Sequence, residues 1–558
     1  MRLALTLLTS LTLLAACGGG GDAAAPAAPA ATTPTGLTLA KIGGYAHAGG
    51  PSSAEIPAYD PISRRLFVVN GANASVDVLS LANPASPTLI GTITAASLGA
   101  NLGAVNSVAV YNGIVALAVE AAPKTDPGLV AWVRASDLAV LHTDTVGALP
   151  DMLTFTPDGS HLLVANEGEP SSYTTPSLAT DPVGSVSVIA VSGLSPTATS
   201  LTRTVRTAGF AAYDGQQAVL QAAGVRIYGP GASVSQDLEP EYITVSADSR
   251  TAYVVLQENN AVATVDIANA SVTAIRSLGT KDHSLAGMGM DVSDEDGGLN
   301  TNTGTPAVRI QTVPVKGLYL PDAIASYAVG GQTYLITANE GDARADWPGF
   351  NEEVRVRAHC PLGLDPTVFT DAANQVLDSN LGRLRVTTAP NGNLTGKNGA
   401  GLCTELYSYG ARSFSVWRAD TLARVYDSGD DFERRTTALP NANFNASNDN
   451  DTLDSRSPSK GPEPEGVVVA SFGAKTFAFI GLERVGGIMV YDVTNPAVPT
   501  FVTYFNPRVS GVLDQTSDRG PEGLAFIPAS ASPNGRPLLI VGNETSGTTA
   551  VLQINLSF

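Results

Sequence analysis

The chain repeats one short unit seven times, and this repeat constrains the fold more than any other feature of the sequence. Each copy opens with an acidic or amide residue and runs as a short apolar strand into a turn. A second apolar strand then ends in Asn or Glu, and a third strand follows. The copy PDMLTFTPDGSHLLVANEGEP, residues 150–170, shows the pattern. Strands in series, joined by turns such as Asp-Gly and without intervening periodic helices, are typical of β-propeller blades.

The repeat therefore predicts an all-β, seven-bladed β-propeller with loop insertions over residues 37–558. Blades usually span about 40–45 residues. These copies are spaced more widely, so several must carry insertions, the largest at about 343–407. We expect residues 214–224 to form a short helix on the fourth blade. The strand at 36–45 could pair with the last blade and close the ring. A two-sheet sandwich, or a pair of smaller domains, is the competing fold.

The composition favours many short strands over helices. The chain of 558 residues holds 56 Gly and 36 Pro, and only 15% of its residues are charged, as in turn-rich β proteins. Its 51 acidic residues exceed its 32 basic residues and give a formal net charge of −19. Because such a surface repels a phosphate backbone, we expect no nucleic-acid partner.

The repeat also places carboxylates at one end of the ring. In a propeller the innermost strand starts on one face, and the antiparallel strand after it returns to that face. The acid before the first strand and the acid after the second should therefore meet at one mouth of the central channel. These acids are Asp151, Glu167, Glu241, Glu258, Asp322, Glu340, Glu465, Glu483, Glu522 and Glu544. The first two copies are the least regular and hold Glu55, Asn70, Asn106 and Glu120 in these positions.

Crowded carboxylates repel one another and raise one another's pKa unless a cation neutralises them. Oxygen ligands without His or Cys suit Ca²⁺ best, with Mg²⁺ or Mn²⁺ as other divalent candidates. The pattern therefore predicts that the ten acids bind metal. Alternatively, each acid caps a turn by accepting backbone N–H groups, although Glu is a poor residue for that purpose.

Several phrases resemble the choice-of-anchor I family of exported bacterial propellers, which is similar to mesenchyme-specific cell-surface glycoproteins. They include DLEPEYITVSADSRTAYVVLQENNA, YLITANEGDARADWPGFNEEVRV and LLIVGNETSGT, and the match covers nearly everything from about residue 50 onward. Members of this family are often labelled alkaline phosphatase-like. The Pro-Glu-Gly phrases at 464–466 and 521–523 are also similar to those of phytase-like propellers, which implies channel calcium ions that bind phosphate.

Two functions follow from this resemblance and from the acidic mouth. One is a calcium-dependent phosphomonoesterase that acts on a phosphorylated small molecule. The other is a non-catalytic, calcium-stabilised module that binds a surface ligand. Lys316, Arg344 and Arg519, with Arg434 and Arg435, could orient a phosphate beside the acids, or could instead form ion pairs that hold the carboxylates. The sequence assigns no catalytic residue.

Other motifs in the sequence are weaker indications of a function than the repeated acids. The five histidines are scattered and show no zinc spacing. The acidic stretches DVSDEDGG, residues 291–298, and NDNDTLD, residues 448–454, do not fit an EF-hand register. They are predicted to be solvated loops, with an ion site of another geometry as the alternative.

The N-terminus has the features of a targeting segment. Residues 1–16 hold Arg2 and an apolar run too short to span a bilayer comfortably, and they resemble a lipoprotein signal that ends before Cys17. Lipidated Cys17 and a Gly/Ala/Pro tether over 17–36 would anchor the protein to the bacterial cell envelope, and Gly18 suggests the outer membrane. An ordinary secretory signal is the alternative. Cys360 and Cys403 are predicted to form a disulfide in an exported protein, with metal ligation as the alternative.

Overall fold

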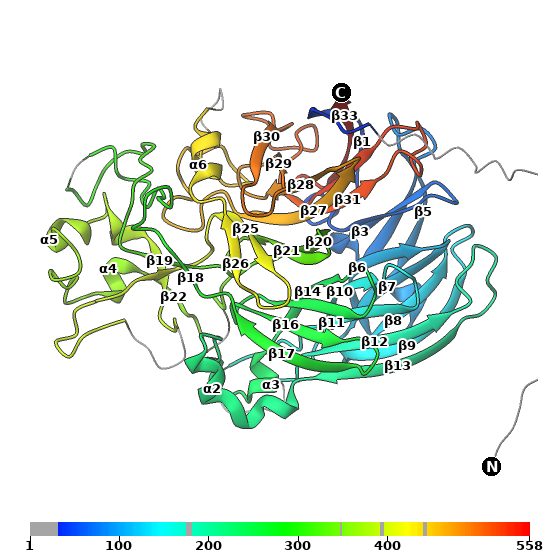
Figure 1. The fold of residues 1–558 in the computed structure, drawn as a ribbon, viewed down its shortest axis with the longest axis horizontal. Coiled ribbons are helices and arrows are strands. Elements are labelled where there is room, and N and C mark those ends of the chain that lie inside the picture. Colours follow the sequence, from blue (N-terminus) through cyan, green and yellow to red (C-terminus); the bar gives the residue numbers. More distant parts are fainter. Residues whose placement is uncertain are drawn as a thin grey trace, which may run out of the picture.

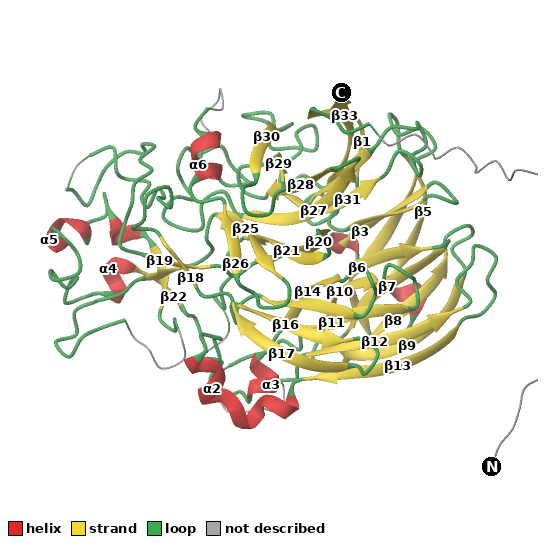
Figure 2. Cartoon of the chain, in the orientation of Figure 1, coloured by secondary structure: helices red, strands yellow, loops and turns green. Residues whose placement is uncertain are grey.

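The computed structural model describes residues 32–173, 181–298, 300–345, 347, 349–390, 396–438 and 443–558. Within these residues the chain forms seven antiparallel four-stranded sheets and one mixed five-stranded sheet (Figures 1 and 2). Six of the four-stranded sheets are built from strands that follow one another along the chain or nearly so. The seventh combines the last three strands with the first.

Each of the seven four-stranded sheets runs from an innermost strand outward. In that order, the first sheet contains β2 (Pro57–Asp60), β3 (Arg65–Asn70), β4 (Ser75–Ser80) and β5 (Thr88–Thr94), and the second contains β6 (Leu102–Tyr111), β7 (Ile114–Ala121), β8 (Pro127–Arg134) and β9 (Val140–Ala148). The third contains β10 (Pro150–Phe155), β11 (His161–Asn166), β12 (Ser185–Ser192) and β13 (Thr202–Gly209), and the fourth contains β14 (Pro240–Val245), β15 (Thr251–Leu256), β16 (Ala261–Asp266) and β17 (Ser271–Ser277). The fifth contains β20 (Ile324–Val329), β21 (Gln332–Asn339), β25 (Ser413–Arg418) and β26 (Arg424–Asp427), the sixth contains β27 (Pro464–Phe472), β28 (Lys475–Leu482), β29 (Ile488–Asp492) and β30 (Thr500–Phe505), and the seventh contains β31 (Pro521–Ile527), β32 (Leu538–Asn543), β33 (Thr548–Ser557) and β1 (Gly36–Ala46).

The innermost strands form a closed ring. Each of β2, β6, β10, β14, β20, β27 and β31 contacts the next one, and β31 contacts β2. Sheets that radiate from such a ring are propeller blades, so the predicted all-β propeller is confirmed and the two-sheet sandwich is wrong. The predicted unit had three strands. The fourth, outermost strand was missed because it is largely exposed, as in β5, and shows little apolar pattern.

The hydrophobic core is divided among the spaces between neighbouring sheets. One cluster packs Leu163 and Val188 of the third sheet against Ile243 and Val254 of the fourth, and comparable clusters fill the other spaces. Second strands such as β11 are buried on both faces, and this is why they appear in the sequence as continuous apolar runs. Full burial of a Val or Leu side chain contributes about 1.5–3 kcal/mol.

The first strand closes the ring as the sequence predicted. β1 pairs with β33 in antiparallel register, from Gly36 opposite Ser557 to Ala46 opposite Thr548. Leu37 and Leu39 are buried against the sixth and seventh sheets. Cys17, the signal and residues 17–31 of the predicted tether lie outside the described residues.

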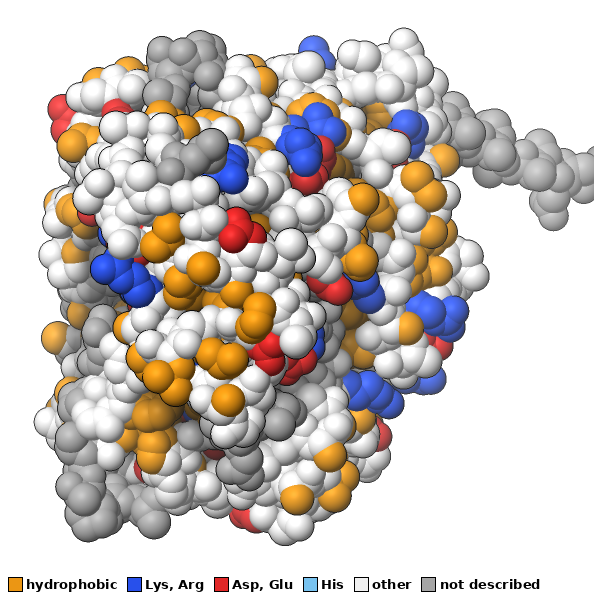
Figure 3. Space-filling view, turned by 90° about the vertical axis from the view of Figure 1, so that its left-hand side faces the viewer, with side chains coloured by type: hydrophobic (Ala, Val, Ile, Leu, Met, Phe, Trp, Pro, Cys, Tyr) orange, Lys and Arg blue, Asp and Glu red, His pale blue; other side chains and the backbone are white. Residues whose placement is uncertain are grey.

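The five-stranded sheet comes from two separate insertions. Its strands lie in the order β18 (Thr280–Asp282), β19 (Lys316–Leu318), β24 (Tyr407–Ser408), β23 (Arg385–Thr387) and β22 (Glu353–Arg355), and β19 pairs in parallel with β24. The predicted disulfide between Cys360 and Cys403 is present, and both cysteines belong to the hydrophobic cluster beside this sheet. Figure 3 views the side of the molecule that carries the insertion and shows hydrophobic side chains scattered among acidic and basic ones.

In the part of the chain that the structure describes, the helices are short and lie outside the sheets. They are η1 (Gly71–Asn73), α1 (Ala95–Leu98), η3 (Ala211–Gln216), α2 (Gln217–Ala222), α3 (Val234–Asp237), α4 (Val356–His359), α5 (Ala372–Gln375), η4 (Leu381–Arg383) and α6 (Asp431–Thr436). The helix expected at 214–224 corresponds to the end of η3 and to α2, and Leu220 packs onto the core shared by the third and fourth sheets. Among the described residues, every helix is too short or too polar to cross a membrane.

Candidate cation site in the central channel

Four innermost strands begin with a proline followed by an acid, and in a fifth, β20, such a pair ends one residue before the strand. The acids are Asp151, Glu241, Asp322, Glu465 and Glu522, which we call the inner carboxylates. In four of these strands the pairing register shifts just after the dipeptide, for example between Pro521 and Leu524. Such a bulge redirects a side chain out of the regular ladder, and proline is tolerated at the first position of a strand.

The acids that end the second strands are fixed on the same rim. The amide of Glu167 donates to the carbonyl of Leu149 (3.0 Å), that of Glu483 to Glu463 (2.8 Å), and that of Glu544 to Gly520 (2.7 Å). Each accepting carbonyl lies two residues before an inner carboxylate. The structure thus places both acids of these blades at one channel mouth, as the repeat predicted.

Glycines let the neighbouring inner strands approach closely. A Cβ atom on Gly466 would lie 2.1 Å from the carbonyl oxygen of Glu522, and one on Gly523 would lie 2.6 Å from that of Glu55. The Pro-Glu-Gly phrase therefore serves packing around the ring as well as placing its acid. This packing brings Glu465, Glu522 and Glu55 next to one another.

A cavity of about 300 Å³ opens between the inner strands. Asp151, Asp322 and Glu522 line it together with Tyr242 and residues of the first, second, third and seventh inner strands. Three inner carboxylates therefore face one space in the channel. Such a space can hold cations and a small anionic group.

Burial and mutual repulsion raise the pKa values of the channel acids. Desolvation and the charges of Glu169 and Glu120 raise the pKa of Asp151 to about 7. Desolvation raises the pKa of Glu258 to about 7, and desolvation with the charge of Glu544 raises that of Glu55 to about 8. The same two causes raise the pKa well above the ordinary range for Glu167, Glu241, Asp322, Glu465, Glu483 and Glu522. Burial also raises the pKa of Glu340, which Lys460 partly offsets.

A second group of acids lies just behind the inner carboxylates and is paired with cations. Arg344 holds Glu239 (2.7 Å) and Asp237 (2.5 Å). Three cations surround Glu463: Arg456 (2.6 Å), Arg484 (2.9 Å) and Lys460 (3.7 Å). Sequence reasoning missed Glu239 and Glu463, although each is the first residue of a Glu-Pro-Glu phrase that ends in an inner carboxylate.

The inner carboxylates differ in that no Lys or Arg among the described residues forms an ion pair with any of them. One oxygen each of Glu241, Glu465 and Glu522 is buried without a hydrogen-bond partner. Of these three, Glu522 also lines the channel cavity, and carboxylate oxygens without a partner are the kind of donor that Ca²⁺ takes. These residues fit a hard divalent cation. By contrast, Glu340, Glu463 and Glu483 form a tight group that Lys460 and Arg484 already neutralise.

The predicted phosphate-binding cations are engaged elsewhere. Lys316 pairs with Glu405 (2.5 Å) on the insertion sheet, and Arg344 is buried between Asp237 and Glu239. Arg519 donates to the carbonyl oxygens of Asn448 and Leu513. Arg434 and Arg435 pair with Asp430 and Asp431 at α6. Lys316, Arg344, Arg434 and Arg435 thus form ion pairs, as in the alternative interpretation of the sequence, whereas Arg519 bonds backbone carbonyls instead.

The first two copies contribute less regularly. Asn70 donates to Asp77 (3.1 Å) and Asn106 to the carbonyl of Pro150 (3.1 Å), so these amides hold the rim rather than add charge. Glu120 accepts from the amide of Ala104 (3.0 Å). Glu55 interacts with the charge of Glu544 and joins the acidic mouth.

The expectation of solvated loops at 291–298 and 448–454 is wrong for several of their aspartates. Asp291 and Asp454 are fully buried, and Asp296 is 6% exposed. The loops fold against the insertion and against the chain before β27, so acidic composition alone did not reveal their burial. Asp449 and Thr452 are exposed, as expected.

Comparison with known proteins identifies related chains. A model of the choice-of-anchor I domain matches residues 55–496. Gigasin-3a of Magallana gigas is 35% identical over 191 residues, which cover 32% of this chain and 66% of that protein. The mesenchyme-specific cell surface glycoprotein of Strongylocentrotus purpuratus is 28% identical over 303 residues, which cover 49% of this chain and 37% of the glycoprotein. The chain thus spans less than two thirds of the length of both relatives.

Solved structures with similar folds include three proteins. Hydrazine synthase of Kuenenia stuttgartiensis aligns over 90% of this chain and 96% of its own, with 12% identity and a TM-score of 0.42. The Swd1 propeller domain of Myceliophteria thermophila aligns over 93% and 100%, with 8% identity and a TM-score of 0.41. The WD40 domain of Toxoplasma gondii coronin aligns over 95% and 89%, with 9% identity and a TM-score of 0.43.

Proposed function

Because the chain belongs to the choice-of-anchor I family, we propose that it is a surface-associated β-propeller whose channel carboxylates bind Ca²⁺. The family and the related cell surface glycoprotein support a surface or exported location. A lipid anchor on Cys17, holding the propeller to the outer membrane, is the form of attachment that the N-terminal sequence favours.

One observation supports the calcium proposal: among the described residues no Lys or Arg pairs with the five inner carboxylates, whereas Asp237, Glu239 and Glu463 behind them are paired with cations. If the acids of the channel mouth served only to hold turns, we would expect arginines and lysines to lie as close to the inner carboxylates as to Asp237, Glu239 and Glu463. Repulsion among unneutralised carboxylates is unfavourable at neutral pH. A bound Ca²⁺ would neutralise them with the oxygen ligands it prefers.

A second candidate, phosphomonoesterase activity, draws on the cavity between Asp151, Asp322 and Glu522. Its volume of about 300 Å³ leaves room for a phosphate group beside bound cations. Bound divalent cations would there hold the phosphate and lower the pKa of a bound water. The engagement of Lys316, Arg344 and Arg519 in other contacts leaves this activity without a free protein cation among the candidates. We therefore rank the calcium-dependent binding module first, with a surface ligand as its partner.

Calorimetric titration of Ca²⁺ into the EDTA-treated protein tests the proposal. We expect Glu522→Gln and Asp322→Asn each to weaken channel binding at least about tenfold, because each removes a ligand charge at a cost of about 1.4 kcal/mol or more. Glu405→Gln is the matched control, since this carboxylate lies on the insertion sheet and pairs with Lys316. Equal affinities in wild type and both channel variants would contradict a calcium site among the inner carboxylates.

The same proteins decide between the two candidate functions. Hydrolysis of p-nitrophenyl phosphate that requires Ca²⁺ and is lost in Glu522→Gln would establish the phosphomonoesterase. Calcium binding without hydrolysis would leave the binding module as the function.

A further inference from the structure

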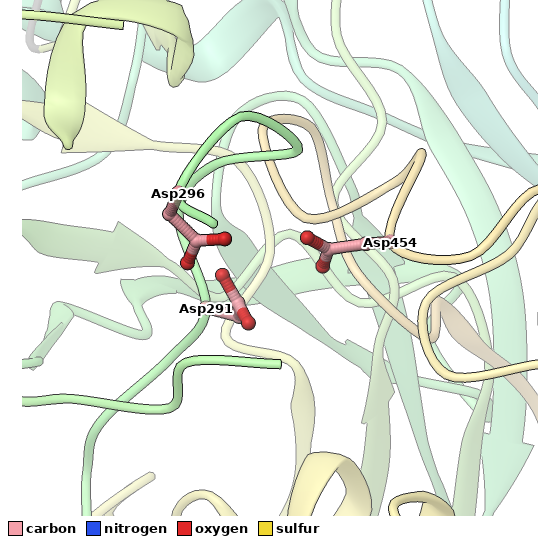
Figure 4. Close-up of side chains that lie close together, drawn as sticks. All are labelled: Asp291, Asp296 and Asp454. Carbon is pink, nitrogen blue, oxygen red and sulfur yellow. The ribbon is translucent and has the colours of Figure 1, made fainter. Parts of the chain in front are cut away.

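Three aspartates outside the channel meet in a buried cluster. Asp291 and Asp296 come from the loop between β18 and β19, and Asp454 comes from the segment between α6 and β27. One carboxylate oxygen of each lies within 4.8 Å of the others. Figure 4 shows the two loops approaching from opposite sides, with the carboxyl groups of Asp296 and Asp454 directed toward each other and Asp291 beside them.

Two of the three carboxyl groups have an oxygen with no partner. Oδ1 of Asp296 and Oδ2 of Asp454 are buried without a hydrogen bond, and the residues are 6% and 0% exposed. A buried carboxylate oxygen without a partner loses the hydration it had in water. Because both orphan oxygens belong to carboxyl groups aimed into the cluster, the geometry itself points to a missing ligand.

Hydrogen bonds hold these groups in place. The amide of Arg309 donates to Oδ2 of Asp291 (2.5 Å), and the hydroxyl of Ser457 donates to Oδ1 of Asp454. The amide of Gly297, next to Asp296, donates to the carbonyl of Thr305 (2.8 Å). A Cβ atom on Gly297 would lie 2.4 Å from Oγ1 of Thr305, so this turn requires glycine. The cluster is therefore built into two ordered loops.

No Lys or Arg in the described part of the chain forms an ion pair with the three aspartates. The nearby Arg412 is committed to Glu433 (2.6 Å). The side chain of Arg309 donates to the carbonyl of Ser379 (3.5 Å) and to Asn380 Oδ1 (3.3 Å). The other tight group of three carboxylates, Glu340 with Glu463 and Glu483, has Lys460 paired with two of its members. The aspartates form no ion pair, although the charge of Arg309 partly offsets the burial that raises the pKa of Asp296 to about 6.

Electrostatics agree with this geometry. Burial and the charge of Glu433 raise the pKa of Asp291 to about 8, and burial and the charge of Asp291 raise that of Asp454 to about 9. A divalent cation of the hard type would occupy the orphan oxygens and neutralise the cluster.

We propose that Asp291, Asp296 and Asp454 form a second Ca²⁺ site, separate from the channel, that fastens the insertion to the sixth blade. The ion would join the loop that leads into β19 to the segment that leads into β27. Irregular loops of this kind suit Ca²⁺, which accepts six to eight oxygens in flexible geometry, better than the near-octahedral Mg²⁺. The remaining ligands would be water or backbone carbonyls.

Hydrogen exchange of the whole protein, measured by mass spectrometry with EDTA or with Ca²⁺, tests this site directly. We expect peptides covering 288–298 and 443–457 to exchange up to about 100-fold more slowly when free Ca²⁺ is about 100 times its Kd. Asp454→Asn should abolish this local protection and lower the calorimetric Ca²⁺ stoichiometry by one ion. Glu522→Gln should leave the local protection intact, because it alters only the channel.

Asp296→Asn serves as the second variant, because a loss of folding in Asp454→Asn would otherwise obscure the result. Local protection and stoichiometry that remain unchanged in both variants would overturn the proposal. So would a wild-type protein in which Ca²⁺ protects neither segment while Asp454→Asn raises the melting temperature in EDTA. That result would show that the aspartates share protons instead of a cation.

Discussion

At the scale of single residues, two glutamates separated by one proline have different environments. In Glu239-Pro240-Glu241 each glutamate has one buried oxygen without a hydrogen-bond partner, but only the first forms an ion pair, with Arg344. The proline between them begins the inner strand, so Glu239 precedes that strand and Glu241 belongs to it. A cation brought by a distant loop, and not the local sequence, decides which glutamate stays free for a ligand.

Arg344 tests how much this pairing contributes. Arg344→Met should lower the free energy of unfolding by about 3–5 kcal/mol, because it leaves Asp237 and Glu239 buried without a counter-charge. Urea unfolding followed by circular dichroism measures the change. Arg418→Met is the matched control: its partner Asp420 is 49% exposed, so a loss of about 0–1 kcal/mol is expected. Similar losses of the free energy of unfolding in the two variants would show that Arg344 contributes only packing and that its charge adds nothing.

At the scale of elements, the first strand is an independent test of ring closure. Leu37 and Thr38 are adjacent in β1 but point to opposite faces, with Leu37 buried and Thr38 exposed. Leu37→Ala should cost about 2–4 kcal/mol because it leaves a gap between the sixth and seventh sheets, whereas Thr38→Ala should change stability by less than about 0.5 kcal/mol. Thermal unfolding checks both. If β1 contributed nothing to the closure of the ring, Leu37→Ala and Thr38→Ala would change the stability by equal amounts.

The elements that the sequence predicted are those with a local signature. The inner strands, the second strands and the acids at their ends repeat in order along the chain, so each copy supports the prediction of the others. The outermost strands lack that signature because water covers one face. The pairing of Arg344 with Glu239, and the meeting of Asp291 with Asp454, join segments more than 100 residues apart. Local patterns contain no information on such contacts.

At the scale of the whole molecule, the acidic mouth makes stability depend on pH. Asp151, Glu258 and Glu55 have folded pKa values of about 7, 7 and 8, above the values near 4 of an unfolded chain. The folded state therefore binds more protons between those limits. The stability that these protonated acids contribute is fully present below about pH 4 and is lost as the pH rises toward 7 to 8.

We accordingly expect the melting temperature in EDTA to fall between pH 5 and pH 8, and added Ca²⁺ to reduce that fall. Scanning calorimetry across this range measures both slopes. Glu55→Gln and Asp151→Asn should each flatten the slope in EDTA, since a neutral amide has no proton to release. A melting temperature that rises over this interval would contradict the folded-state protonation of the channel acids.

The pairing of β1 with β33 also governs when the fold can form. The hydroxyl of Thr35 donates to the carbonyl of Ser557, a partner 522 positions along the chain. The ring therefore stays open until the last strand has been synthesised, and its final contact joins residues near the two ends of the chain. The propeller is therefore still incomplete when its first six blades have been synthesised, and it closes only once β33 can pair with β1.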